Sequence, residues 1–137
     1  GVASTPLISL LKKGETEDDY AAALEFLKDA SPVTVDFELR SLGPWDHKFM
    51  SEEDVKNLSS GIKFFTKTIE SGLYYELVNA HLSIFLEAHT TAIMESEDLV
   101  RECHALRAAA HKTYTRIDDL FNEVQCALSF HAGQFGT

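Results

Sequence analysis

The stretch "SPVTVDFELRSLG", residues 31–43, fits either a strand or a helix, and the fold class of the chain depends on which of the two it forms. Its middle alternates apolar and polar residues, the two-residue period of a half-buried strand. It begins, however, with Ser31-Pro32, a typical helix start, and ends with Gly43-Pro44, a typical helix stop. The two ends of the stretch therefore favour a different structure from its middle.

A helix is the better prediction because a strand here would have no partner. No other segment alternates convincingly, and no Asn-Gly or Asp-Gly hairpin turn occurs. On a helix, Val35, Leu39 and Leu42 lie at i, i+4 and i+7 and share one face. We therefore expect a helix that buries this face and offers Phe37 on another.

Capping residues, prolines and glycines divide the rest of the chain into five further helical segments. The predicted boundaries are Thr5-Pro6 to Gly14, Asp18 or Asp19 to Ala30, Ser51 to Gly72, Tyr74 to Met94, and Ser96 to about Phe130. The last segment has apolar or small residues at alternating spacings of four and three, which predicts one long helix. They are Leu99, Cys103, Leu106, Ala110, Thr113, Ile117, Leu120 and Val124.

The sequence therefore predicts an all-α fold of about six helices with a long C-terminal helix. The helices would form an antiparallel bundle or a short α-solenoid, two arrangements that the sequence does not separate. The expected organisation is a flexible start at residues 1–4, one helical domain at 5–131 and a frayed tail at 132–137. Because the chain opens with "GVAST", we expect an excised piece of a larger protein, with Gly1 left by cloning.

The charge of the chain disfavours direct binding to nucleic acid. The 137 residues include 22 acidic and 12 basic ones, a formal net charge of −10, which repels phosphate backbones. There is no basic amphipathic segment for a membrane surface. The longest apolar stretch, 73–94, carries charged residues and histidines, so we do not expect it to cross a bilayer.

No catalytic, cofactor or metal site is predicted. His81 and His89 share a face two turns apart, but a metal would need a third ligand such as His104 or His111. We expect these histidines at the edges of the core. Cys103 and its neighbour His104 diverge by about 100° on a helix, so they do not form a nucleophile–base pair.

The two cysteines are predicted to be free thiols. Cys103 and Cys126 would lie about 35 Å apart on one helix at 1.5 Å per residue, whereas a disulfide requires Cα atoms within about 7 Å. Free thiols suit a reducing cell interior.

Several aromatic residues are candidates for a protein interface. Trp45 lies in a predicted loop. We expect it to act as a plug that covers the core of its own domain, and the alternative is that it anchors a partner protein. In the pairs Phe64-Phe65 and Tyr74-Tyr75 only one residue each is expected to point fully inward. The candidate interface residues are Phe37, Trp45, Phe64, Tyr74 and Tyr75. A binding module is thus favoured over an enzyme.

Four blocks of the sequence resemble one known family. They are "PLISLLKKGE" (6–15), "YAAALEFLKDASPVTVDFELRSL" (20–42), "YELVNAHLSIFLEAH" (75–89) and "LFNEVQCALSF" (120–130). In order and spacing they are similar to the C-terminal domain of the Utp twenty-one family, nucleolar proteins with tandem WD-repeat propellers. The most specific part is 31–42. Its motif residues are Ser31, Pro32, Asp36, Glu38, Leu39, Arg40 and Leu42.

The resemblance implies a non-catalytic assembly domain in the UTP-B subcomplex of the small-subunit processome, which processes 18S pre-rRNA in the nucleolus. It implies contact with other UTP-B subunits, most directly the C-terminal domain of the periodic tryptophan protein. The U-three small nucleolar ribonucleoprotein and pre-rRNA would be partners only indirectly. Within the motif, Leu39 and Leu42 are expected to pack, and Asp36, Glu38 or Arg40 to bond between helices. The alternatives, in order of preference, are a helical domain that contacts RNA directly and a helical-bundle metal site.

Overall fold

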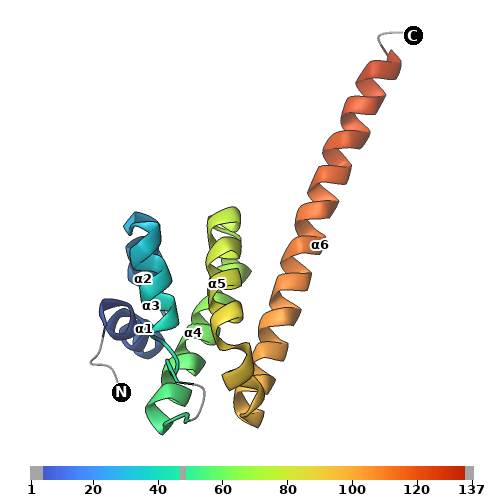
Figure 1. Cartoon of the computed structure of the whole chain (residues 1–137). Helices are drawn as coiled ribbons and strands as arrows, with labels where there is room; N and C mark the ends of the chain where they lie inside the picture. Colours follow the sequence, from blue (N-terminus) through green and yellow to red (C-terminus); the bar gives the residue numbers. More distant parts are fainter. Residues whose placement is uncertain (1–4, 47–48, 135–137) are drawn as a thin grey trace.

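The computed structural model describes residues 5–46 and 49–134, and in this part of the chain the fold is all-α. Its helices are α1 (Pro6–Glu17), α2 (Ala21–Asp29), α3 (Pro32–Arg40), α4 (Glu52–Ser71), α5 (Tyr75–Met94) and α6 (Glu97–Gln134). The predictions of about six helices and of a long C-terminal helix are confirmed (Figure 1). The predicted flexible start, residues 1–4, lies outside the described residues.

The stretch that could be a strand or a helix forms α3. Ser31 is its N-cap, and the Ser31 hydroxyl accepts a hydrogen bond from the Thr34 N–H at 3.2 Å. Pro32 occupies the first turn, where no intrahelical N–H donor is needed. The chain leaves the helix through Gly43, where a Cβ atom would lie 2.5 Å from Nδ1 of His89. Local capping therefore outweighed the alternating pattern.

Replacing Ser31 by alanine removes this cap, and we expect it to lower the free energy of unfolding by about 1 kcal/mol. Urea denaturation followed by circular dichroism measures the change. Ser83→Ala is the matched control, because Ser83 is exposed in the middle of α5 and has no hydrogen bond from its side chain to a described residue. Equal stability losses in the two variants would contradict a capping role.

Helix α1 does not end at Gly14 as predicted, but continues to Glu17. Asp18 then ends it in the left-handed conformation, with φ of 51°. A Cβ atom at position 14 would lie 2.6 Å from Cδ1 of Tyr20. Gly14 is thus an interior residue of α1 that lets Tyr20 pack closely on the helix. The predicted helix end at Gly14 was wrong because this glycine is needed for packing and does not end the helix.

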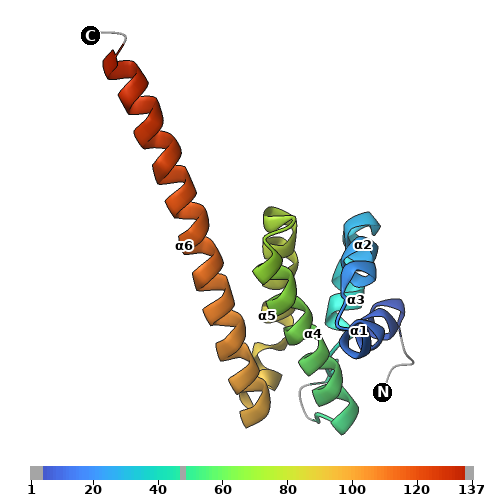
Figure 2. The same cartoon turned by 180° about the vertical axis from the view of Figure 1, so that it is seen from behind.

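Helix α4 is central to the arrangement. It contacts α1, α5 and α6, while α3 packs mainly on α5 and α2 on α1. Figure 2 shows α4 between α1 and α6. At Gly61 helix α4 packs closely on α5, because a Cβ atom there would lie 2.9 Å from the ring of Phe85. Because it has neighbours on several sides, α4 is buried on more than one face.

The two adjacent phenylalanines of α4 are both buried, which corrects the prediction that one of them faces outward. Phe64 is 2 % exposed and Phe65 is 1 % exposed. Their directions differ by about 100°, but each meets a different neighbour. Phe64 packs edge-on against Tyr20 with centroids 5.7 Å apart, and Phe65 lies 5.3 Å from Phe85 of α5. Phe64 is therefore not a surface residue.

The C-terminal part of α6 extends far beyond the other helices (Figures 1 and 2). The tail predicted to fray from residue 132 remains helical through Gln134, and residues 135–137 lie outside the described part. Among the described residues, no helix combines the length and apolar character needed to cross a membrane.

Candidate interaction surface

The most distinctive feature of the domain is the change in burial along α6. Leu99, Leu106 and Thr113 are at most 5 % exposed, and they pack the first half of the helix against the body of the domain. From Asp118 to Cys126, by contrast, every described side chain is exposed. We call residues 117–126 the distal segment of α6.

Two polar contacts mark the point where α6 leaves the body of the domain. The Thr113 hydroxyl donates to the Ile69 carbonyl of α4 at 3.2 Å. The Tyr114 hydroxyl donates to Oδ1 of Asn79, and its ring packs edge-on against Tyr75 with centroids 5.3 Å apart. The distal segment begins one turn later, so its orientation is set by a well-anchored helix.

The distal segment nevertheless keeps an apolar face. Ile117, Phe121 and Val124 lie at i, i+4 and i+7, and therefore on one side of the helix. Phe121 is 64 % exposed and Val124 is 55 % exposed. The side chain of Leu120, which belongs to the predicted stripe, lies outside the described part. An exposed apolar face on a projecting helix is typical of helix–helix association.

The remaining candidate interface aromatics lie on other surfaces. Phe37 and Trp45 are 50 % and 53 % exposed, and their rings contact each other with centroids 6.0 Å apart. Trp45 thus covers Phe37 at the surface and does not plug the core, which corrects that prediction. Tyr74 and Tyr75 are 49 % and 39 % exposed, with the Tyr74 ring under the Lys28 ammonium at 5.0 Å.

The motif residues of 31–42 hold α3 in place. Leu39 and Leu42 are both 1 % exposed. Asp36 pairs with Arg40 at 3.0 Å within α3. Glu38 is 4 % exposed, and its Oε2 accepts from the Leu7 N–H of α1 at 3.4 Å. Of the charged residues suspected of bonding between helices, Glu38 joins α3 to α1, whereas Asp36 and Arg40 pair with each other.

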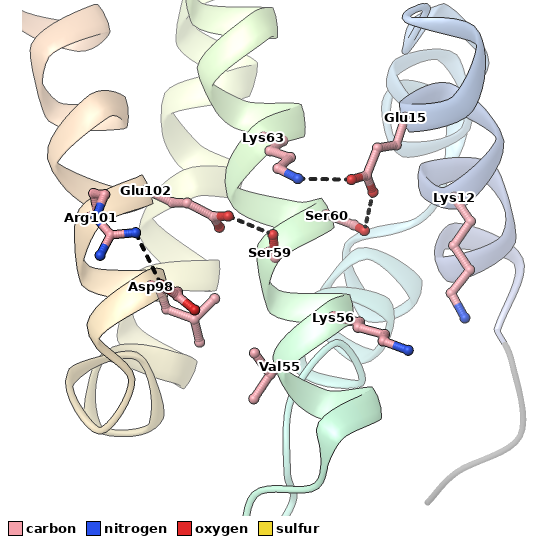
Figure 3. A pocket seen from close by; sticks show the side chains of 11 residues that line it. Lys12, Glu15, Val55, Lys56, Ser59, Ser60, Lys63, Asp98, Arg101 and Glu102 are labelled. Carbon is pink, nitrogen blue, oxygen red and sulfur yellow. Dashed lines mark hydrogen bonds and ion pairs between the residues drawn. The ribbon is translucent and has the colours of Figure 1, made fainter.

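A hollow of about 470 Å³ lies between α1, α4 and α6 (Figure 3). Glu15 of α1 accepts hydrogen bonds from Lys63 at 2.9 Å and from Ser60 at 2.8 Å. The bond from Lys63 holds the pKa of Glu15 below its usual value. Ser59 donates to Glu102 of α6 at 2.8 Å. Both serine hydroxyls donate to carboxylates on other helices, so the arrangement joins α4 to α1 and to α6.

Of the four histidines considered as metal ligands, the two on α5 are buried and the two on α6 are exposed. His89 is 1 % exposed, and its Nε2 lies 2.8 Å from the Leu39 carbonyl of α3. His81 is also buried, whereas His104 and His111 are exposed. No group of three or more metal-ligating side chains occurs among the described residues.

The two cysteines are both free, as predicted. Cys103 is half-buried, and burial raises the pKa of its thiol, which reduces the fraction of reactive thiolate. Cys126 is exposed on the distal segment.

Burial lowers the pKa of both His81 and His89 below the ordinary value of 6.5. The unfolded chain therefore binds protons at these two histidines near pH 6.5, whereas the folded chain binds them only at lower pH. We expect the free energy of unfolding to fall as the pH drops below 6.5, measured by urea denaturation at a series of pH values. His81→Leu should flatten this dependence, whereas His111→Leu, at an exposed position, should leave it unchanged. Identical slopes in the wild-type and His81→Leu chains would contradict the assignment.

Residues 2–132 match the family described as the Utp21-specific WD40-associated domain. The chain belongs to the Utp21 family. It is 27 % identical over 120 residues to human WD repeat-containing protein 36, covering 88 % of this chain and 13 % of the relative. It is 30 % identical over 112 residues to U3 small nucleolar RNA-associated protein 21 of Saccharomyces cerevisiae, covering 80 % of this chain and 11 % of that protein. The Utp21-family domain thus spans about an eighth or less of these relatives.

Two exposed aromatics of this Utp21-family domain are not among the predicted interface residues. Phe121 lies beside the predicted stripe of α6, which includes Leu120 and Val124. Its position four residues after Ile117 is the signal that could have identified it. Phe49, which is 82 % exposed, follows a loop and belongs to no periodic pattern.

Proposed function

We propose that this Utp21-family domain is a non-catalytic assembly module of a ribosome-biogenesis factor. It joins WD-repeat subunits of the UTP-B subcomplex within the small-subunit processome, and so serves 18S pre-rRNA processing in the nucleolus. Family membership supports this assignment, as does the similarity to the yeast U3 small nucleolar RNA-associated protein 21.

The observation that carries the proposal is the exposed apolar face of the distal segment. A helix with Phe121 and Val124 in water gains stability when a second helix covers that face. The charged residues within the distal segment are Asp118, Asp119 and Glu123, and Arg116 lies just before it. The segment therefore carries a net negative charge. The negative charge of the segment disfavours pairing with a second copy of the same helix, which favours a different partner chain.

The most direct partner is the C-terminal domain of the periodic tryptophan protein subunit. Contact with the U-three small nucleolar ribonucleoprotein and with pre-rRNA is then indirect, through other subunits. The net charge of −10 supports a protein partner over an RNA partner.

Light scattering on a sizing column tests the proposal. The domain is measured alone, and then mixed with the C-terminal domain of the periodic tryptophan protein. We expect a monomer alone and a stable 1:1 complex in the mixture. Two separate monomer peaks, or a homodimer that excludes the partner, would overturn the pairing. A titration with structured RNA at physiological salt should show no binding.

A further inference from the structure

The apolar face of the distal segment continues the face by which α6 packs on the body of the domain. Thr113 contacts α4 and Tyr114 contacts α5 through the hydrogen bonds described above. Ile117 lies three residues after Tyr114, one turn further along the same side of the helix. A helix that covers the distal segment therefore lies directly beyond the turn that joins α4 to α5 (Figure 1).

This turn offers apolar side chains of its own. Leu73 is 59 % exposed, and Tyr75 at the start of α5 is 39 % exposed. Both residues line one small hollow together with Tyr114 of α6. The α4–α5 turn and the distal segment thus form two sides of one corner, and a partner helix seated there meets apolar side chains on both sides.

Carboxylates flank the apolar face of the distal segment on both edges. At about 100° per residue, Asp118 lies about 100° from Ile117 in one direction, and Glu123 lies about 120° from it in the other. Asp119 lies on the opposite side of the helix. All three carboxylates are exposed, and none has an ion pair or hydrogen bond to another residue within 5–46 and 49–134.

The basic residue that precedes the segment does not neutralise these carboxylates. The side chain of Arg116 is directed back to the body of the domain, where its Nη2 would lie 3.2 Å from a Cβ atom at Gly72. Gly72 ends α4, and the negative end of a helix dipole favours a cation there. The edges of the apolar face therefore stay negative, and they attract basic side chains of a partner.

We propose that the distal segment binds a basic amphipathic helix of the partner protein. The apolar stripe of that helix covers Ile117, Phe121 and Val124, and its lysine or arginine side chains pair with Asp118 and Glu123. The inference rests on the proposed function and adds the chemistry of the partner. An acidic helix with the same stripe buries the same apolar area, but it places like charges along both edges and is rejected, as at the flanking positions of coiled coils.

Two synthetic helices test this charge preference. Both have about 21 residues and the same leucine stripe, and the positions that flank the stripe are lysine in one and glutamate in the other. The fluorescein-labelled peptides are titrated with the full 137-residue chain and followed by fluorescence anisotropy. In about 50 mM salt we expect the lysine peptide to bind at least about tenfold more tightly. In about 500 mM salt the difference should shrink, because salt screens exposed charges.

Two double variants separate the flanking carboxylates from the overall charge. Asp118→Asn with Glu123→Gln should weaken binding of the lysine peptide about fivefold and bring the two peptides within about twofold of each other. Glu87→Gln with Glu95→Gln is the matched control, because it removes two exposed carboxylates at the end of α5 that is remote from the α4–α5 turn. This control should keep the full preference for lysine. Phe121→Ala should weaken both peptides, which locates them on the apolar face.

Equal binding of the two peptides, binding of neither, or a lysine preference that survives the Asp118→Asn and Glu123→Gln changes would each overturn the basic-helix inference. The assembly proposal is decided separately by light scattering. A 1:1 complex with the periodic tryptophan protein domain that is indifferent to these two changes retains the assembly role and overturns the basic helix. A lysine preference without that complex retains the basic helix and overturns the pairing.

Discussion

Replacing Phe85 by alanine is expected to lower the free energy of unfolding by about 3–5 kcal/mol. Phe85 is completely buried at the centre of the core. Its ring lies 5.3 Å from that of Phe65 and 5.1 Å from that of His89, and it fits over Gly61. Truncation leaves a cavity between α4 and α5 that these well-ordered neighbours fill only in part. Urea denaturation monitored by circular dichroism measures the loss.

The matched control is Phe49→Ala, the same substitution at a side chain that is 82 % exposed. Its stability should stay within about 0.5 kcal/mol of the wild type. A loss below about 1 kcal/mol for Phe85→Ala would show that α5 packs on α4 differently from the arrangement described above.

The second large effect is expected at the distal segment of α6. Phe121→Asp places a charge in the centre of the apolar face formed with Ile117 and Val124. We expect it to weaken the proposed complex with the periodic tryptophan protein domain at least about 100-fold, because a buried unpaired charge and a lost aromatic anchor act together. Isothermal titration calorimetry measures the affinity. The stability of the isolated domain should not change, because Phe121 is 64 % exposed there.

Asn122→Asp is the control for charge. It introduces the same carboxylate one residue further along, where the helical periodicity points it away from the apolar face. Binding by this variant should remain within a few-fold of the wild type. If both variants bind as well as the wild type, the distal segment is not the interface. If both lose binding equally, the effect comes from net charge and not from the apolar face.

The helix boundaries were largely predictable because caps act locally. Ser31 and Ser51 cap their helices through hydrogen bonds to N–H groups three residues ahead, contacts within a single turn. Gly72 ends α4 in the left-handed conformation, with φ of 72°, which glycine adopts without strain. The predicted helix end at Gly14 was wrong because this glycine serves a packing contact and not a local cap. The space that it leaves is filled by Tyr20, which lies beyond the turn that follows α1.

The interaction surface was only partly predictable. The apolar spacing along α6 revealed a continuous stripe, but the sequence does not state how far the rest of the chain covers it. Phe64 illustrates the same limit, since an adjacent aromatic pair was expected to leave one ring exposed, yet a helix with neighbours on several sides buries both. Burial depends on which helices meet, and that depends on contacts between residues far apart in the sequence.

The sequence alone predicts an all-α fold, most of the helix boundaries and an acidic net charge. These properties follow from hydrogen bonds and side-chain periodicity within one or two turns, and from composition. The folded chain, by contrast, is needed to see that Glu38 joins α3 to α1, that Trp45 lies on Phe37 at the surface, and that α6 leaves the domain after Tyr114. The physical reason is that these outcomes depend on long-range packing around α4, which a local pattern does not encode.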